Sequence, residues 1–177
     1  MSKYCAITGD KPTRFKFGYK ENYSLCKKIK RVMLEQIKEL YEIGVTRFYI
    51  GGSLGVDLWA GEMILRLKEQ PGYEAIELVV VVPFKGHDRN WDERSRKRLE
   101  FLIKHSKEYM TAGETNCQES YAERNCYMVE QTNCMLAVCD NEMENPSAIE
   151  KMIRYARKRK QRIIFIHPDT AKVTITE

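Results

Sequence analysis

Short apolar runs alternate along this chain with longer segments in which apolar residues recur every three or four positions. The runs are strand-like and cover residues 3–8, 45–50, 77–82, 134–139 and 162–166, with shorter candidates at 109–111 and 172–176. The segments between them predict helices over about 25–41, 56–67, 93–104, 119–132 and 146–156. This alternation favours an α/β three-layer sandwich, in which helices cover both faces of a mainly parallel sheet of about five to seven strands.

The length and composition are those of a single domain spanning residues 1–177. Hydrophobic residues make up 43% of the chain and charged residues 31%, which is enough for one globular core. No apolar run approaches the roughly 20 residues that a membrane helix needs, and no charged-then-apolar leader precedes the first strand. We therefore expect a cytoplasmic protein with no membrane partner. The 6 cysteines are not expected to form a disulfide framework, and Cys5, Cys134 and Cys139, which lie in or beside apolar runs, are expected to be small buried residues.

A glycine turn follows the second strand-like run. It reads Gly51-Gly52-Ser53-Leu54-Gly55 and leads directly into a predicted helix. The free N–H groups of a first helical turn can bind phosphate, and glycines let a ligand approach the backbone closely. The alternative is that these glycines serve packing alone. Asp57 and Glu62 add two carboxylates at or near the start of the helix.

Polar and aromatic residues also lie where other predicted strands end. In a parallel sheet the carboxyl ends of the strands meet at one edge, where ligands bind. An aromatic ring there can stack on a base, and an arginine can pair with a phosphate. The candidate ligand-binding residues are Thr8, Gly9, Arg14, Gly51, Gly52, Ser53, Leu54, Gly55, Asp57, Phe84, Asn90, Trp91, Arg124, Asn125 and Asp140.

Several common motifs are absent from the sequence. Gly-x-x-x-x-Gly-Lys-Ser/Thr does not occur, which argues against a P-loop NTPase. No Gly-x-Gly-x-x-Gly follows the first strand, which argues against an ordinary dinucleotide dehydrogenase. No Cys-x-x-Cys occurs, and His87, His105 and His167 have no partners at metal-ligand spacing, so no metal site is predicted.

Three segments of the sequence resemble the bacterial YpsA-like family. They are residues 5–12, residues 51–62, and residues 82–84 with 90–91, and the closing stretch 172–176 is also similar. That family belongs to the SLOG superfamily, together with the DNA-processing protein DprA and the LOG-type phosphoribohydrolases. The resemblance implies a Rossmann-like fold and a nucleotide-derived ligand, such as an ADP-ribose-like or NAD-like compound. It assigns the binding loop to Gly51, Gly52, Gly55 and Asp57.

The resemblance extends less clearly to activity. The LOG signature Pro-Gly-Gly-x-Gly-Thr is missing near the fourth strand, where residues 137–142 read Ala-Val-Cys-Asp-Asn-Glu. This departure argues against LOG-type hydrolysis. Relatives in the YpsA group are linked to bacterial cell division and stress responses, which the resemblance implies as a cellular setting.

Three functions compete. The first is binding or sensing of a nucleotide-like small molecule, with no obligatory cofactor; a homo-oligomer is compatible with the sequence. The second is an enzyme that cleaves or transfers at an N-glycosidic bond, with Glu62 or Asp57 as the catalytic carboxylate. The third is single-stranded nucleic-acid binding, which basic stretches at 27–31 and 151–162 favour. Acidic residues are interspersed and no aromatic-basic repeat occurs, so we do not expect a nucleic-acid partner.

Overall fold

The computed structural model describes residues 3–141 and 148–177. Its strands are β1 (Lys3–Gly9), β2 (Val45–Ile50), β3 (Glu77–Val82), β4 (Glu108–Thr111), β5 (Cys134–Val138), β6 (Arg162–Ile166) and β7 (Val173–Thr176). Its helices are α1 (Ser24–Glu42), α2 (Val56–Lys68), α3 (Glu93–His105), α4 (Gln118–Gln131) and α5 (Ala148–Lys158), with a 3-10 turn η1 (Pro12–Arg14). The start expected for the last helix at residue 146 lies outside the described residues. No helix within the described ranges is long and apolar enough to cross a membrane.

All the strands join one sheet in the order β4-β3-β2-β1-β5-β6-β7. Every neighbouring pair is parallel except β6 and β7, which are antiparallel. Parallel strands require crossover connections, and the helices predicted between the strands supply them. The predicted class, a Rossmann-like α/β sandwich, is confirmed.

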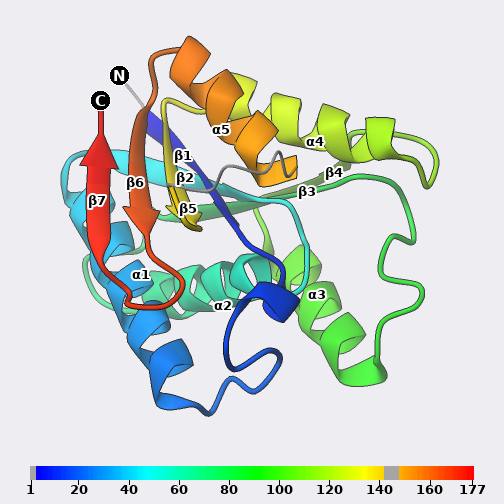
Figure 1. Cartoon of the computed structure of the whole chain (residues 1–177), viewed down its shortest axis with the longest axis horizontal. Helices are drawn as coiled ribbons and strands as arrows, with labels where there is room; N and C mark the ends of the chain where they lie inside the picture. Colours follow the sequence, from blue (N-terminus) through cyan, green and yellow to red (C-terminus); the bar gives the residue numbers. More distant parts are fainter. Residues whose placement is uncertain (1–2, 142–147) are drawn as a thin grey trace.

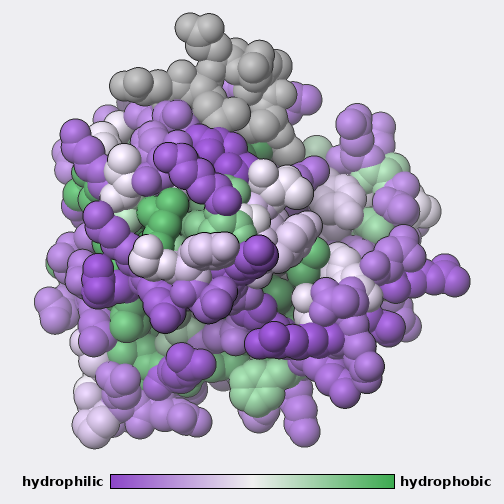
Figure 2. All heavy atoms as spheres, turned by 60° about the horizontal axis from the view of Figure 1, so that its bottom comes forward, coloured by the Kyte–Doolittle hydropathy of each residue, from purple (hydrophilic) through white to green (hydrophobic). Residues whose placement is uncertain are grey.

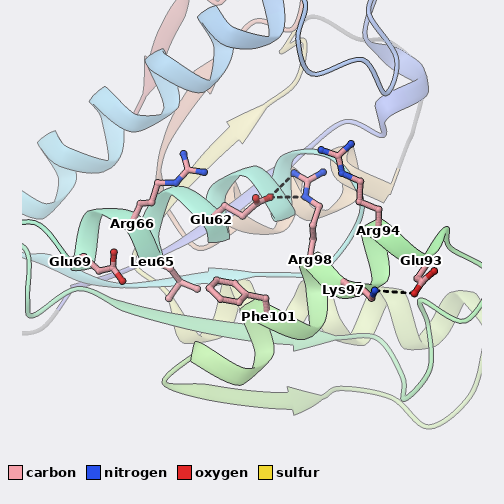
Figure 3. Close-up of a pocket in the computed structure, with 9 residues that line it drawn as sticks. All are labelled: Glu62, Leu65, Arg66, Glu69, Glu93, Arg94, Lys97, Arg98 and Phe101. Carbon is pink, nitrogen blue, oxygen red and sulfur yellow. Dashed lines mark hydrogen bonds and ion pairs between the residues drawn. The ribbon is translucent and has the colours of Figure 1, made fainter.

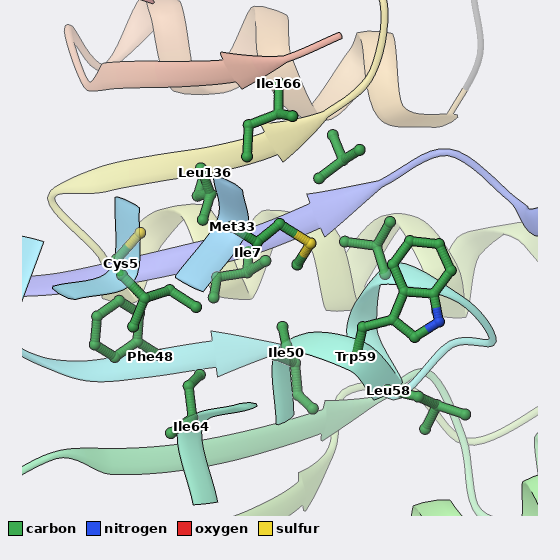
Figure 4. Close-up of a cluster of buried hydrophobic side chains, with 14 of the residues drawn as sticks. Cys5, Ile7, Met33, Phe48, Ile50, Leu58, Trp59, Ile64, Leu136 and Ile166 are labelled. Atoms are coloured by element: carbon green, nitrogen blue, oxygen red, sulfur yellow. The ribbon is translucent and has the colours of Figure 1, made fainter. Parts of the chain in front are cut away.

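Two hydrophobic cores cover opposite faces of the sheet. Successive residues of a strand point to opposite faces, so Cys5 and Ile7 pack into the core beneath α1, α2 and α3, whereas Ala6 packs into the core beneath α4 and α5. Figure 1 shows the two helix layers on either side of the sheet. Figure 4 shows the larger core, in which Met33 of α1 and Trp59 of α2 lie over the central strands. The result is a rigid platform whose strand ends can carry a site.

The direction of the strand order reverses at β1. Connections through α1, α2 and α3 lead from β1 toward β4, whereas β5 and β6 lie on the other side of β1 and are joined through α5. Loops that leave the carboxyl ends of β1 and β5 therefore diverge. Open α/β sheets commonly bind ligands at such a reversal point.

Candidate functional site

The loop between β2 and α2 lies at the carboxyl edge of the sheet. Gly52 (φ 68°) and Gly55 (φ 86°) adopt positive φ values that residues with a side chain rarely take. Gly55 occupies the N-cap position of α2, and no side chain caps this helix start. The first N–H groups of α2 therefore lack the side-chain partner that many helices provide.

Asp57 shapes this loop from within. Its side chain is buried, and its carboxylate accepts a hydrogen bond from the Ser53 N–H at 2.9 Å. Burial raises the pKa of Asp57, whereas the charge of Arg124 and the hydrogen bonds from the loop oppose that rise. The carboxylate thus holds the loop in place, and its partner is a backbone group.

Arg124 reaches the same loop from α4, on the other side of the sheet. Its Nη1 donates to the Gly51 carbonyl at 2.7 Å and to Ser53 Oγ at 3.3 Å, and its Nε donates to Asn125 Oδ1 at 2.9 Å. A Cβ on Gly51 would lie only 2.8 Å from Nη1. Gly51 therefore makes room for Arg124. At this position the glycine serves packing, which is the alternative that the sequence left open. Burial lowers the pKa of Arg124, and the nearby charge of Asp57 opposes that effect.

The segment after β1 packs directly on the start of α2. A Cβ on Gly9 would lie 2.3 Å from Val56 Cγ2, and one on Gly55 would lie 3.0 Å from Pro12 Cγ. Thr8 pairs with Ala137 of β5 at the adjoining strand end. These contacts bring the carboxyl ends of β1 and β2 together as the sequence predicts.

Asp10 follows β1 and is a site residue that the sequence analysis missed. It is 8% exposed, and its Oδ2 has no hydrogen-bond partner among the described residues. Burial raises the pKa of Asp10 to about 6, with Arg14 opposing and the carboxylates of Asp140 and Asp169 adding to the rise. Asp140 was a candidate because it directly follows a buried strand, and Asp10 directly follows a buried strand as well.

Ion pairs surround Asp10 at the reversal point of the sheet. Arg14 Nη1 and Nη2 donate to the two carboxylate oxygens of Asp169 at 3.3 and 3.2 Å. His167 Nε2 lies 3.7 Å from Asp140 Oδ2. Arg14 and Asp140, both predicted site residues, thus lie near the buried carboxyl group. No group of three or more His, Cys, Asp or Glu side chains in the described part of the chain is arranged to hold a metal ion.

An aromatic group borders the glycine loop on its β3 side. Phe84 contacts His87 and Tyr121 edge-on, at centroid distances of 6.3 and 5.9 Å, and His87 contacts Trp91 at 5.3 Å. His87 Nε2 lies 2.8 Å from the Gly52 carbonyl oxygen, which ties the group to the loop. Phe84 is buried and Trp91 is partly exposed, so Trp91 is the ring better placed to meet a base. Asn90, just before it, is exposed.

Glu62 lies on a different side of α2 from Asp57. It is five residues beyond Asp57, which turns it by about 140° around the helix axis. Its carboxylate pairs with Arg98 of α3 (Figure 3), and Arg98 Nη1 also donates to Glu21 at 2.6 Å. Both predicted catalytic carboxylates are therefore engaged, Asp57 with the loop and Glu62 with an arginine.

The family model YpsA, described as the YspA SLOG family, matches residues 5–171. The chain belongs to this SLOG family. Two relatives are UPF0398 proteins of Bacillus cereus (strain B4264) and Bacillus thuringiensis (strain Al Hakam). Each is 28% identical over 160 residues, which cover 89% of this chain and 84% of the relative. The expected resemblance is thus confirmed over most of the chain.

The SLOG protein also resembles a solved structure of DNA processing protein A from Helicobacter pylori, described for its single-stranded DNA binding mode. The TM-score is 0.57 at 17% sequence identity, and the match covers 92% of this chain and 64% of that one, just under two thirds of its length. The likeness therefore concerns the fold.

The expectation of no nucleic-acid partner is wrong. A protein with this fold is described as binding single-stranded DNA, so the arrangement of elements is compatible with that ligand. The expectation relied on the order of charges along the sequence. A folded surface gathers cations from segments far apart in the chain, and no local aromatic-basic repeat is then needed.

Proposed function

We propose that this protein binds a nucleotide-derived small molecule at the carboxyl edge of the sheet, between the loop of residues 51–55 and Asp10. Membership of the SLOG family and the likeness to a DNA-binding protein support nucleotide or nucleic-acid binding in general. The geometry of the edge supports the more specific ligand, an ADP-ribose-like or NAD-like compound.

The unpartnered Oδ2 of Asp10 is the observation that carries this proposal. Buried polar atoms are nearly always hydrogen-bonded, because an unmet hydrogen bond costs about 1–3 kcal/mol. A ribose hydroxyl that donates to this oxygen would remove that cost. Asp10 suits a ribose hydroxyl better than Asp57 does, because the Asp57 carboxylate already accepts from the Ser53 N–H.

The other groups at the edge complement the remaining parts of such a ligand. The uncapped start of α2 offers N–H groups to a phosphate. The partly exposed ring of Trp91 offers a face or edge to a base. A diphosphate with two ribose units has hydroxyl donors and anionic oxygens at separate positions, which suits an edge with acceptors on the β1 side and N–H donors on the α2 side.

A thermal-shift titration with NAD, ADP-ribose, AMP and cyclic dinucleotides tests the proposal. A ligand with micromolar affinity, present at millimolar concentration, stabilises the folded state by about 4 kcal/mol. For a chain of this size the melting temperature should rise by about 10 °C. The Asp10→Asn variant should lose most of the shift, whereas Glu35→Gln, the same chemical change on the exposed face of α1, should keep it. A folded protein that shifts with none of these compounds would refute the proposal.

Single-stranded DNA is a second candidate ligand, favoured by the likeness to the Helicobacter pylori protein. Fluorescence anisotropy with a labelled oligothymidylate measures it directly. Phosphate contacts release counterions, so binding should weaken steeply as salt is raised. Binding that does not change with salt would contradict contacts to the phosphate backbone.

A further inference from the structure

A groove separate from the carboxyl-edge site runs between α2, α3 and the segment before α1. It consists of two cavities of about 680 and 630 Å³. Glu62, Arg66, Arg94 and Arg98 line both cavities, so the two are continuous. Each alone is large enough for a small ligand, and together they form a path that suits an extended one.

Arg98 holds the middle of this groove in place. Its guanidinium donates to Glu21 and to Glu62, and Lys30 also pairs with Glu21 at 2.7 Å. These contacts join α2, α3 and the segment before α1 through a single side chain, and Figure 3 shows the Arg98–Glu62 pair that links α3 to α2. The groove is therefore a fixed feature of the folded protein rather than a gap between independent helices.

Arg66 and Arg94 stand on either side of this ion-paired centre (Figure 3). Arg66 comes from α2 and Arg94 from α3, and neither has a carboxylate partner within the described residues. Lys20, which lines the second cavity, also has no carboxylate partner in the part of the chain that the structure describes. Glu21 and Glu62 are balanced by Arg98 and Lys30 together. Three cations and one carboxylate, Glu69, are then without an ionic partner among the described residues, which leaves a net positive charge to meet an external anion.

An exposed aromatic ring lies at each end of the groove. Phe101 lines only the first cavity and is 53% exposed, and Tyr19 lines only the second and is 64% exposed. Most of the surrounding face is hydrophilic (Figure 2). Exposed rings beside arginines are the arrangement with which proteins hold unpaired bases and the adjoining phosphates.

We infer that this groove binds a single-stranded nucleic acid, with its phosphates at Arg66 and Arg94 and its bases stacked on Phe101 and Tyr19. The inference rests on the second candidate function above and assigns it a place. A duplex does not suit the site, because paired bases cannot offer their faces to the rings. A free nucleoside triphosphate would fill only one of the two cavities.

Anisotropy measurements with a labelled oligothymidylate of about 15 nucleotides, near the upper end of known site sizes, test the inference. The double variant Arg66→Ala/Arg94→Ala should weaken binding on the order of tenfold and reduce the slope of log K against log salt by about 1.4, the value for two phosphate contacts on a single strand. Neither arginine has a carboxylate partner among the described residues that its loss would leave unpaired, so the fold should survive. Phe101→Ala should weaken binding to the oligonucleotide with little change in the salt slope, because it removes stacking alone.

The matched control is Arg31→Ala/Arg96→Ala. Both arginines are exposed on α1 and α3, neither lines the groove, and the net charge changes equally. The inference requires this control to bind as the wild type does. Equal losses in both double variants would show that net charge alone matters and would overturn the groove.

Two further results separate the groove from the carboxyl-edge site. The Arg66→Ala/Arg94→Ala variant should keep the thermal shift with nucleotides, since that site is elsewhere. ATP should compete only weakly with the oligonucleotide, and a duplex should bind less tightly than the single strand. If the wild type binds the oligonucleotide and the groove variants bind it equally well, the groove is not the binding site, but single-stranded DNA binding itself stands. A wild type that binds no oligonucleotide overturns both, and efficient competition by ATP shows a nucleotide pocket instead.

Discussion

At the scale of the residue, Asp10 keeps an ionisable group where ionisation is unfavourable. Its carboxyl group is buried beside Asp140 and Asp169, and only Arg14 compensates among the nearby charges. A residue selected for stability alone would not place an unpartnered oxygen there. Its position at the reversal point of the sheet fits a role in binding, because binding groups often stand in environments that cost stability.

The pH dependence of stability should reveal this cost. The unfolded carboxyl titrates near pH 3.8 and the folded one near 6. Between these values the folded state holds a proton on Asp10 that the unfolded state has lost, so the contribution of Asp10 to the free energy of unfolding should fall as pH rises from about 4 to about 6, and then stay level. Asp10→Asn should remove this fall and be more stable than the wild type by up to about 3 kcal/mol at pH 8.

Urea denaturation at pH 4 and at pH 8 measures the difference. The two proteins should be nearly equal at pH 4, where the wild-type carboxyl is protonated in the folded state. Glu35→Gln, at an exposed position, should follow the wild type at both pH values. A variant that is less stable than the wild type at pH 8 would mean that Asp10 is a stabilising group and would contradict its assignment as an isolated acceptor.

The sequence could locate the glycine loop but not explain each glycine. The strand, turn and helix pattern is local, so it identified residues 51–55 correctly as the loop at the strand end. Gly51 faces Arg124, which is 73 residues away in the chain. No local pattern reports such a contact. The buried state of Asp10 likewise depends on the packing of β5 and β6 beside β1.

At the scale of the element, strand positions followed closely from the sequence. The runs 45–50, 77–82 and 162–166 match β2, β3 and β6, because a strand buried on both faces needs a continuous apolar stretch. The α2–α3 groove was not predictable in the same way. Its cations look like the solvated faces of two separate helices until the fold places those helices side by side.

The contact between β1 and α2 gives a test at this scale. A Cβ on Gly9 would lie within 2.8 Å of three atoms of Val56, so Gly9→Ala should push the start of α2 away from the sheet. Overpacking of this kind costs about 1–3 kcal/mol. Adding Val56→Ala should recover much of the loss, because the smaller side chain leaves room for the new methyl group.

A double-mutant cycle on the free energy of unfolding measures this coupling. Gly72→Ala is a contrasting control: its φ of 94° makes the substitution strained, but nothing lies within 4 Å of the added Cβ. Val56→Ala should therefore not rescue it. Losses at Gly9 and Val56 that simply add would show that the two residues do not share the contact.

At the scale of the whole molecule, the two cores are joined through every central strand. In β3, Leu78, Val80 and Val82 pack beneath α1, α2 and α3, and Val79 and Val81 pack beneath α4 and α5. One helix layer cannot lose its packing without exposing a face of the same strands that support the other. We therefore expect residues 1–177 to unfold as a single cooperative domain.

Probes in opposite cores can test this cooperativity. Trp59 lies in the larger core and is 3% exposed, and Cys139 lies in the smaller core and is also 3% exposed. Burial raises the pKa of Cys139 to about 12, so its thiol should resist alkylation until the smaller core opens. In a Trp91→Phe background, the fluorescence of Trp59 should change at the denaturant concentration at which Cys139 becomes reactive.

Brief alkylation across a denaturant series, with peptide mass analysis, identifies the labelled cysteine. The exposed Cys126 should react throughout and serves as the internal control. Because the sheet belongs to both cores, the two midpoints should coincide. Labelling of Cys139 while Trp59 fluorescence remains native would mean that the α4–α5 layer opens by itself. Arg124 of α4 would then leave the glycine loop whenever that layer opened, and the carboxyl-edge site would be intact only while both layers were closed.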